Sequence, residues 1–428
     1  FLDGTKERGI SREKANEIFD QIAAFAGYGF NKSHAAAYAL IAYQTAWIKT
    51  NYIYEFFVSM MTLENNNTDK LFLFVEDAKK LGLKILQPCI NKSSFEFLIE
   101  DVSSSEFGIR YSLSSIKNVG TEAVKNIVKI REIDGEFKNI DEFLNRVPYS
   151  LVTKKSIESL IKSGAFDKIE SNRNKLFRSI DLMLNYSHSI EKEKSSYQSN
   201  LFNNNDFNKL PINLEDITKW SFQEAINNEF SSLGLYLSAH PLDSYSNILS
   251  KINVTKSIEI LNEPDKFLKK NVKLCGLIFN IQKRQSPRGR WVSIQLNDLS
   301  GSVDINIYSD VLIKYEDYLI EKNLILIDAE IKNENNQINR IVAKRIYLLN
   351  DYISNNKYNI TLFTNSNKHL DKLVPLLRVL EVGYSDILIS CSNKEQQVEI
   401  KIKENIKLSS KFINDLSTMN GIDHIRFS

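Results

Sequence analysis

The run AGYGFNKSHAAAYALIAYQTAWIK, from Ala26 to Lys49, constrains the fold of this chain more than any other segment. A turn marked by two glycines leads into a short polar cluster, and a long apolar stretch follows. Apolar residues continue to about Met61 on nearly all sides of the helix that this stretch predicts. A helix of that kind is normally buried, so we expect it to lie inside a helical domain.

The polar cluster at the head of this helix has two interpretations. Backbone N–H groups at a helix N-terminus are unpaired and bind phosphate, and a cluster rich in side-chain donors would add to them. The same residues could instead only cap the helix. A metal site is not expected, because the five histidines are scattered through the chain. The candidate contacts to a nucleotide phosphate, sugar or base are Asn31, Lys32, Ser33 and His34.

Length and composition are those of a soluble protein with several domains. The 428 residues are too many for one core, and 43% of them are hydrophobic and 25% charged. A formal net charge of +2 excludes a uniformly basic nucleic-acid coat, so any such binding must use local patches. The three distant cysteines predict reduced thiols and a cytoplasmic location. No run is apolar enough to suggest a membrane partner.

The segment SLSSIKNVGTEAVKNIVKIRE, Ser112–Glu132, has the pattern of a helix–hairpin–helix. We expect Leu113 and Ile116 on the first helix, and a tight hairpin before the second, whose free N–H groups and glycine admit a DNA phosphate. Asparagine replaces the first glycine of the usual Gly–hydrophobic–Gly pattern, and asparagine tolerates left-handed backbone. A purely structural hairpin is the alternative. The candidate DNA contacts are Lys117, Asn118, Val119, Gly120 and Lys125.

Alternating residues from about Asn271 to Leu348 predict five strands, with a helix between the third and the fourth. That order is typical of an OB-fold barrel. We therefore predict a multidomain, mixed fold: an α-helical region with the helix–hairpin–helix, then an all-β OB-fold barrel, then a small α/β C-terminal domain. The predicted boundaries are 1–85, 86–250, 268–350 and 358–428, with a polar linker at 189–211.

The first turn of the predicted barrel, QKRQSPRGRW, combines several arginines with an aromatic residue. OB-folds bind single strands through basic grooves and aromatic stacking, so this turn is a candidate DNA contact. A basic hairpin tip that is only solvated is the alternative. The residues concerned are Arg284, Arg288, Arg290 and Trp291.

The polar linker contains an apolar pair, Leu201 and Phe202, three residues after Gln198. An isolated apolar pair cannot form a core where it stands. It has the form of a docking peptide, in which the pair fills a pocket and the glutamine forms a hydrogen bond beside it. Alternatively, the pair anchors the loop to its own domain.

These pieces, in this order and over essentially the whole chain, resemble the C-terminal part of the bacterial replicative DNA polymerase III alpha subunits. The strongest match is the Ala26–Lys49 run, and the KNVG hairpin also matches. Three further segments match: LGLKILQPCIN at Leu81–Asn91, LIKSGAFD at Leu160–Asp167 and LGLYLSAHPLDSY at Leu233–Tyr245.

The resemblance implies part of a DNA-directed DNA polymerase of replication. Residues 1–85 would belong to the fingers, with the 31–34 cluster facing the incoming deoxynucleoside triphosphate and His34 helping to reject a ribose 2′-hydroxyl. The hairpin would hold primer–template DNA, and the barrel would lie near single-stranded template. Gln198, Leu201 and Phe202 would bind the sliding clamp, and the C-terminal domain would contact a clamp-loader subunit.

The same resemblance places the catalytic carboxylates and their Mg²⁺ ions in a palm that we expect to precede residue 1. It therefore implies no catalytic and no metal-binding residue in this chain, and no polymerisation by the chain alone. A stand-alone, clamp-recruited DNA-binding adaptor without polymerase activity is the alternative. The family's error-prone accessory polymerase is a further possibility, against which the clamp motif argues.

Overall fold

The structure is a computed structural model of the 428-residue chain. It describes all residues except 27–30, 105, 152, 196–211, 288, 335–337, 365–372, 393–396, 418, 420, 421, 423 and 428. The chain divides into two compact units, Phe1–Leu63 and Glu64–Ser428, and each is treated by itself. Among the described residues, no helix combines the length and apolarity that crossing a bilayer requires.

The first unit is helical. Its longest helix, α3, begins where the Asn31 side chain accepts the Ser33 N–H at 3.0 Å. It ends at Asn51, and the next residue, Tyr52, has a φ of −134° that departs from helical geometry. The prediction that this apolar helix is buried is wrong for the described structure, in which no residue of α3 is buried. The pattern requires an apolar partner, and the described part of this unit supplies none that covers it. The helices are α1 (Leu2–Lys6), α2 (Arg12–Ala26), α3 (Lys32–Asn51) and α4 (Ile53–Leu63).

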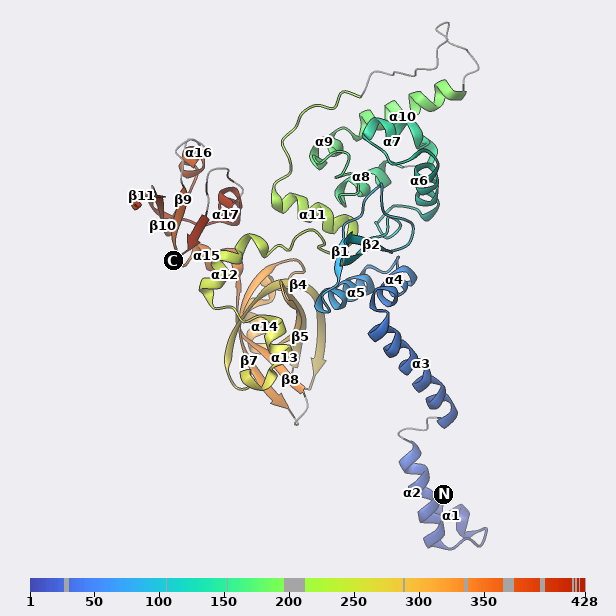
Figure 1. Ribbon diagram of the computed structural model, residues 1–428. Helices are drawn as coiled ribbons and strands as arrows, with labels where there is room; N and C mark the ends of the chain where they lie inside the picture. The colour runs from blue at the N-terminus through green and yellow to red at the C-terminus, as the bar shows by residue number, and fades with distance from the viewer. Residues whose placement is uncertain are drawn as a thin grey trace. The chain divides into compact units, whose positions relative to one another are not determined.

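The second unit opens with helices gathered around a small sheet (Figure 1). The sheet has the order β1-β3-β2, with β1 parallel and β2 antiparallel to β3. α10 continues to Ser195, so the beginning of the predicted linker is helical. The elements are α5 (Thr68–Lys80), β1 (Lys84–Leu86), β2 (Leu98–Ser103), β3 (Glu106–Arg110), α6 (Thr121–Asp134), α7 (Ile140–Arg146), α8 (Lys154–Lys162), α9 (Arg173–Arg178), α10 (Ile180–Ser195), α11 (Phe222–Leu233), α12 (Ser246–Ile252) and α13 (Ser257–Asn262).

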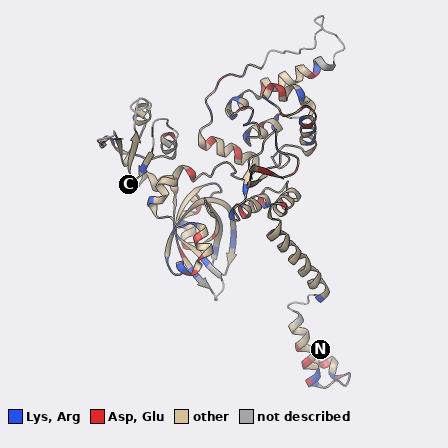
Figure 2. Ribbon diagram, in the orientation of Figure 1, with Lys and Arg blue, Asp and Glu red and all other residues tan. Residues whose placement is uncertain are grey.

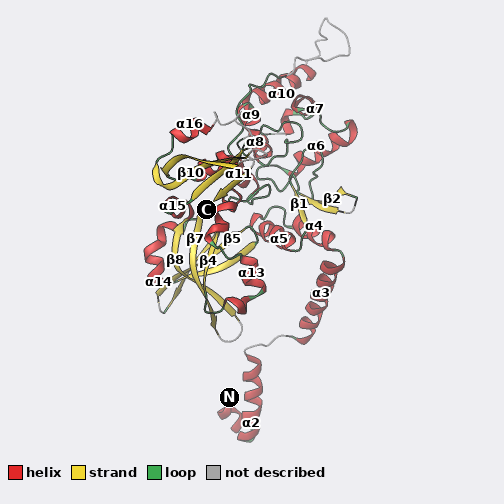
Figure 3. Ribbon diagram, turned by 60° about the vertical axis from the view of Figure 1, so that its left-hand side comes forward, coloured by secondary structure: helices red, strands yellow, loops and turns green. Residues whose placement is uncertain are grey.

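A closed barrel follows, with the order β4-β5-β6-β8-β7 (Figure 3). Adjacent strands of the barrel are antiparallel, except that β6 and β8 are parallel and pair at Ile305 and Ile341. The helix α14 lies in the chain between the third and fourth strands, so the OB-fold prediction is confirmed. The barrel encloses aliphatic side chains, including Ile294 and Ile327. The elements are β4 (Asn271–Ser286), β5 (Gly289–Asp298), β6 (Gly301–Ile307), α14 (Ser309–Tyr315), β7 (Leu324–Glu334) and β8 (Ile338–Leu348).

The C-terminal part is the predicted small α/β domain, with a sheet of order β11-β10-β9-β12. Its core is continuous with one outer side of the barrel, because Cys275 of β4 and Leu326 of β7 pack in the same buried cluster as Ile360 and Phe412. All three cysteines are free thiols, and Cys275 is fully buried. The elements are α15 (Leu349–Ser354), β9 (Asn359–Thr364), α16 (Leu373–Arg378), β10 (Val382–Ser392), β11 (Gln397–Ile406), α17 (Ser410–Ser417) and β12 (His424–Phe427).

Candidate nucleic-acid interface

The first helix of the predicted helix–hairpin–helix is absent, and that detail of the prediction is wrong. Two successive turns replace it, closed by the Ile116 N–H on the Leu113 carbonyl at 3.2 Å and by the Val119 N–H on the Ile116 carbonyl at 3.1 Å. The serines explain the difference, since the Ser112 hydroxyl accepts the Ser114 N–H at 3.1 Å and such local bonds compete with helix formation.

The tip of the hairpin has the backbone that the sequence indicated. Asn118 takes a φ of +64°, the left-handed conformation that asparagine tolerates. The hairpin is fastened to α8: the Ser156 hydroxyl donates to the Asn118 carbonyl at 2.7 Å, and the Asn118 amide donates to the Ser159 hydroxyl at 3.3 Å. These bonds fix the position of the tip on its own domain.

Gly120 is the N-cap of α6 and has no capping side chain. The first helical bond comes from the Val124 N–H to the Gly120 carbonyl, so the N–H groups of 121–123 have no acceptor within the helix. A β-carbon built at Gly120 would meet no atom within 4 Å. This open helix N-terminus has the geometry with which a backbone receives a phosphate.

The two lysines predicted beside the hairpin differ in their surroundings. Lys125 is exposed and forms an ion pair with Glu122 at 2.8 Å, which offsets its charge. Lys117 donates its backbone N–H to the Ser232 carbonyl at 2.9 Å, and its ammonium would lie 3.5 Å from a β-carbon at Gly234. Among the predicted DNA contacts of the hairpin, Val119 is buried, so its side chain packs in the core and does not lie at the surface.

The barrel carries a second candidate surface around Trp291. The Arg284 guanidinium lies 5.3 Å from the centre of the Trp291 ring, and the centre of the Tyr308 ring lies 5.9 Å from it. A cavity of about 690 Å³ opens here, with Arg290, Lys332, Trp291 and Tyr308 in its wall. Cations beside aromatic rings are the groups that OB-folds use for single-stranded nucleic acid. Arg288, the fourth predicted residue, lies outside the described residues.

The aromatic and basic residues of this cavity that were not predicted are Tyr308, Lys332 and Arg340. Barrel closure brings them to the first turn from separate segments of the chain, and no local signal in the sequence marks them. Position 289 requires glycine for two reasons. Its φ is +117°, and a β-carbon there would lie 2.8 Å from the Ser309 hydroxyl oxygen.

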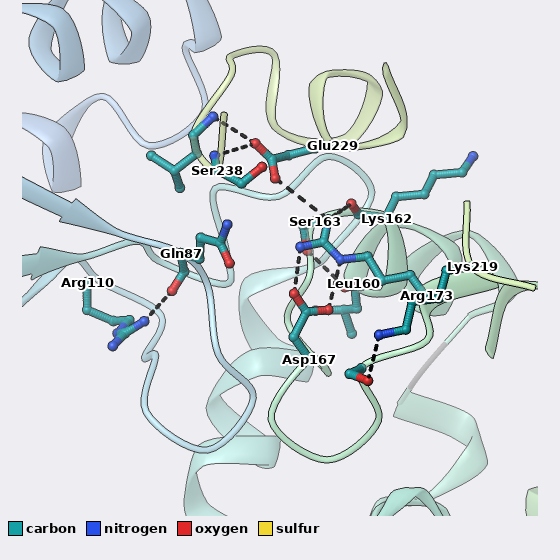
Figure 4. Close-up of polar contacts among 12 residues, drawn as sticks. Gln87, Arg110, Leu160, Lys162, Ser163, Asp167, Arg173, Lys219, Glu229 and Ser238 are labelled. Atoms are coloured by element: carbon teal, nitrogen blue, oxygen red, sulfur yellow. Dashed lines mark hydrogen bonds and ion pairs between the residues drawn. The ribbon is translucent and has the colours of Figure 1, made fainter. Parts of the chain in front are cut away.

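A buried ionic cluster holds the helical region together (Figure 4). Arg173 donates to both carboxylate oxygens of Asp167, at 2.8 and 2.6 Å, and its guanidinium lies 3.6 Å from a Glu229 oxygen. The other Glu229 oxygen accepts the backbone N–H groups of Leu237 and Ser238, at 2.7 and 2.8 Å. Burial opposes the charge of Arg173, but the bonds to Asp167 and the charge of Glu229 outweigh it and raise its pKa.

The backbone that Glu229 holds belongs to residues 234–242, here called the connecting segment, which contacts the barrel. His240 accepts the Leu242 N–H on Nδ1 at 3.1 Å, so its Nε2 carries the proton and donates to the Asn297 side chain at 2.9 Å. The Asn297 amide donates in turn to Glu76 of α5 at 3.1 Å. Burial lowers the pKa of His240 and favours its neutral form, although the bond to Asn297 acts in the opposite direction. The segment Leu233–Tyr245, one of those that match the family in sequence, therefore contacts the barrel through a hydrogen bond that stabilises the fold.

The 31–34 cluster is at the N-terminus of α3, with all four residues exposed. Asn31 acts as the helix cap, since its side-chain oxygen accepts both the backbone N–H and the hydroxyl of Ser33. The His34 ring lies 4.3 Å from that of Tyr38. α3 has no charged residue between Lys32 and Lys49, so the cluster is the polar end of an apolar helix (Figure 2).

Gln198, Leu201 and Phe202 lie outside the described residues. Among the residues that the structure does describe, no group of three or more His, Cys, Asp or Glu side chains could hold a metal ion.

Comparison with known proteins identifies the relatives of the chain. Residues 82–176 match the family model described as a helix-hairpin-helix motif. The chain is 32% identical, over all of its length, to the DNA polymerase III subunit alpha of Neisseria meningitidis serogroup A, of which it covers 37%. It is 32% identical over 95% of its length to that of Borreliella burgdorferi, and 33% identical over 79% to that of Caulobacter vibrioides, covering 35% and 29% of them.

Some solved structures resemble a part of this chain weakly. The mitochondrial single-stranded DNA binding protein Rim1 of S. cerevisiae is 17% identical, covers 18% of this chain and 92% of its own, and has a TM-score of 0.17. The second OB-fold domain of replication protein A from Methanococcus maripaludis is 12% identical, with coverages of 19% and 86% and a TM-score of 0.16. These scores are too low to assign a fold, which follows here from the strand order.

The sequence relatives are consistent with one another and with the helix–hairpin–helix match. The chain spans a little over a third of the length of the Neisseria meningitidis and Borreliella burgdorferi relatives. Over its whole length, the chain is therefore similar to a part of the DNA polymerase III alpha subunits.

Proposed function

We propose that this chain is a part of a DNA-directed DNA polymerase of replication that holds DNA and attaches the enzyme to its partners. The observation that carries the proposal is the 32% identity to polymerase alpha subunits along the entire chain. The open N-terminus of α6 and the cation–aromatic cavity on the barrel add two surfaces suited to DNA. The hairpin would hold primer–template duplex, and the barrel would bind unpaired template.

The remaining roles follow from the same proposal. Lys32, Ser33 and His34 would contact an incoming deoxynucleoside triphosphate, while Asn31 keeps the helix N-terminus in shape through its cap. Gln198, Leu201 and Phe202 would bind the sliding clamp, and the C-terminal α/β domain a clamp-loader subunit. The nucleotidyl transfer itself would use Mg²⁺ held by carboxylates of the whole polymerase, outside this chain.

Salt dependence of DNA binding tests the central claim. Phosphate contacts release counterions, so the affinity of the chain for a primer–template duplex should fall about tenfold between 50 and 200 mM salt, if only a few contacts form. Fluorescence anisotropy with labelled DNA measures this. An affinity that does not change with salt would contradict the proposal.

A glycine substitution tests the hairpin directly. Gly120→Ala places a methyl group where a phosphate would approach, yet its β-carbon meets no protein atom. We expect it to weaken duplex binding by about fivefold through loss of one close backbone contact. Gly4→Ala, also at an open position, is the matched control and should bind as the wild type does.

Clamp attachment has its own test. Phe202→Ala and Gln198→Ala should each weaken binding to a sliding clamp, because one empties a pocket and the other removes a hydrogen bond. Phe207→Ala, in the same part of the chain, is the control. Undiminished affinity in both variants would refute the docking role.

A further inference from the structure

A second cavity lies between the helical region and the barrel, on the side where Lys117 leaves the hairpin. Its volume is about 490 Å³, within the range of about 300–1,000 Å³ for small-ligand sites. Lys117 and Phe230 contribute to its wall from the helical region, and Asn280, Gln295 and Lys322 contribute from the barrel. The hairpin and the barrel therefore share one cavity.

The backbone around this cavity is shaped to keep it open. Gly234, the residue that ends α11, has a φ of +79°, and a β-carbon there would lie 3.0 Å from the Thr68 β-carbon and 3.5 Å from the Lys117 ammonium. Lys322 also has a left-handed backbone, with a φ of +73°, and its N–H donates to the Ile278 carbonyl at 2.8 Å. Its ammonium lies 4.5 Å from the centre of the Phe230 ring.

The chemistry of the wall fits a nucleotide. Two ammonium groups can bind a phosphate, and the side-chain amides of Asn280 and Gln295 can bond to the edge of a base. Asp69 and Glu321 also line the cavity and balance the formal charge of the lysines. Binding would therefore depend on direct contacts and not on a net positive field.

The outer face of β4 and β5 continues from this cavity toward Trp291. The register pairs Asn280 with Gln295, Gln282 with Ser293 and Arg284 with Trp291. The alternate pair, Ile281 with Ile294, points into the barrel core, so the polar pairs face outward. Trp291 lines the other cavity. The outward-facing pairs of β4 and β5 therefore join the two cavities over about 13 Å, which is the length of four strand residues.

We infer that the cavity between Lys117 and Lys322 takes the first unpaired nucleotide where a single strand leaves duplex held by the hairpin, and that the β4–β5 face leads this strand to the Trp291 cavity. This inference rests on the proposed DNA-holding function and names the place where its two surfaces join. The two lysines then contact the same short stretch of DNA backbone.

The test compares three labelled DNAs with the full chain: a blunt duplex, a single strand, and a duplex with a tail of about ten nucleotides, a length within OB-fold site sizes. Lys322→Gln removes the charge and keeps a polar side chain that is one atom shorter. It should weaken binding of the tailed duplex by about fivefold, as expected for one lost phosphate contact, and binding of the blunt duplex by less than twofold. Lys251→Gln on α12, a lysine outside the cavity, should match the wild type.

The carboxylate beside Lys322 gives a test of opposite sign. Glu321→Gln should strengthen binding of the tailed duplex by about twofold, because a negative charge near the phosphate is removed. A wall with only a structural role would not give opposite effects for these neighbouring substitutions. Asn280→Ala, at an exposed position, should also weaken tailed-duplex binding if a base is contacted there.

The failures of the two proposals are distinguishable. If the wild type binds DNA with the expected salt dependence, but Lys322→Gln behaves as Lys251→Gln does on the tailed duplex, the inference is wrong and the proposed function stands. An equal loss on blunt and tailed duplexes also overturns the inference. If the wild type binds none of the three DNAs, both are wrong. A double-mutant cycle with Lys117→Gln should show effects that do not add, as for two groups that share one contact.

Discussion

The helical region of the second unit and the barrel are stabilised in different ways. Buried carboxylate and amide groups, among them those of Glu229 and Asn91, secure backbone in the helical region that belongs to no helix or strand. The barrel core around Ile294 and Ile327 is aliphatic throughout. Strand ladders satisfy the backbone of the barrel, whereas the irregular segments of the helical region need side chains to do so. The comparison predicts that the helical region is the more sensitive to charge and pH.

The largest effect should come from breaking the ionic cluster. Glu229→Ala removes the acceptor for two N–H groups and one charge partner of Arg173, and should lower the free energy of unfolding by about 4 kcal/mol. Urea unfolding measures the loss, and hydrogen exchange should place it in the connecting segment. Asn227→Ala, exposed on the same helix, should cost less than about 0.5 kcal/mol. Equal losses in the two variants would remove the distinction between the regions.

A substitution that leaves a cavity in the barrel core should instead have an effect that does not depend on pH. Ile294 is fully buried, and Ile294→Ala should cost about 3 kcal/mol through lost apolar contacts. Because no ionisable group is involved, the loss should be the same at pH 7 and pH 5. Ser293→Ala, which faces outward from the same strand, is the control. A clear pH dependence of the Ile294→Ala loss would count against the comparison.

Glu100 sharpens the comparison at acid pH. Its carboxylate accepts from Arg110 and Lys92, each at 2.6 Å, and the bond from Arg110 is the main cause that lowers its pKa from 4.5 to about 2. The stabilisation is present above pH 4.5 and is lost as the pH falls through 2. Glu100→Gln should cost about 1 kcal/mol at pH 7 and remove this part of the acid dependence. Urea unfolding from pH 7 to pH 2 measures both, with the exposed Glu122→Gln as control.

The smallest effect should lie at the contact between the connecting segment and the barrel. Burial lowers the pKa of His240, so the folded state resists protonation and loses stability as the pH falls below the unfolded value of 6.5. His240→Gln should reduce this loss. Hydrogen exchange of residues 234–242 at pH 7.5 and 5.5, corrected for intrinsic rates, measures it. The exposed His188→Gln should keep the wild-type dependence, and an unchanged dependence in His240→Gln would identify another group as its source.

The sequence predicted the barrel well because the required information is local. Alternation along each strand, the turn from Asp298 to Gly301 and the position of α14 all follow from neighbouring residues. The Trp291 cavity was predicted only in part, since Tyr308 and Lys332 reach it through barrel closure. A pattern along one segment cannot show which distant segment will lie beside it.

The helical region was harder to predict for a related reason. The Asn118 conformation followed from residue type, but the turns in place of a first helix depend on hydroxyl groups bonding to nearby backbone. The role of Glu229 was not predicted, because a carboxylate in an amphipathic helix normally indicates a solvent-facing position. For α3, the sequence indicated a need for burial without specifying the surface that would meet it.

The shared core of the barrel and the C-terminal domain gives the protein an internal reporter. Cys275 lies in that core, where burial raises the pKa of its thiol and so suppresses the reactive thiolate, while Cys391 is only partly buried. An alkylating reagent should modify Cys391 first and reach Cys275 only when the packing of the shared core opens. The labelling rate of Cys275 would thus report how often that core opens.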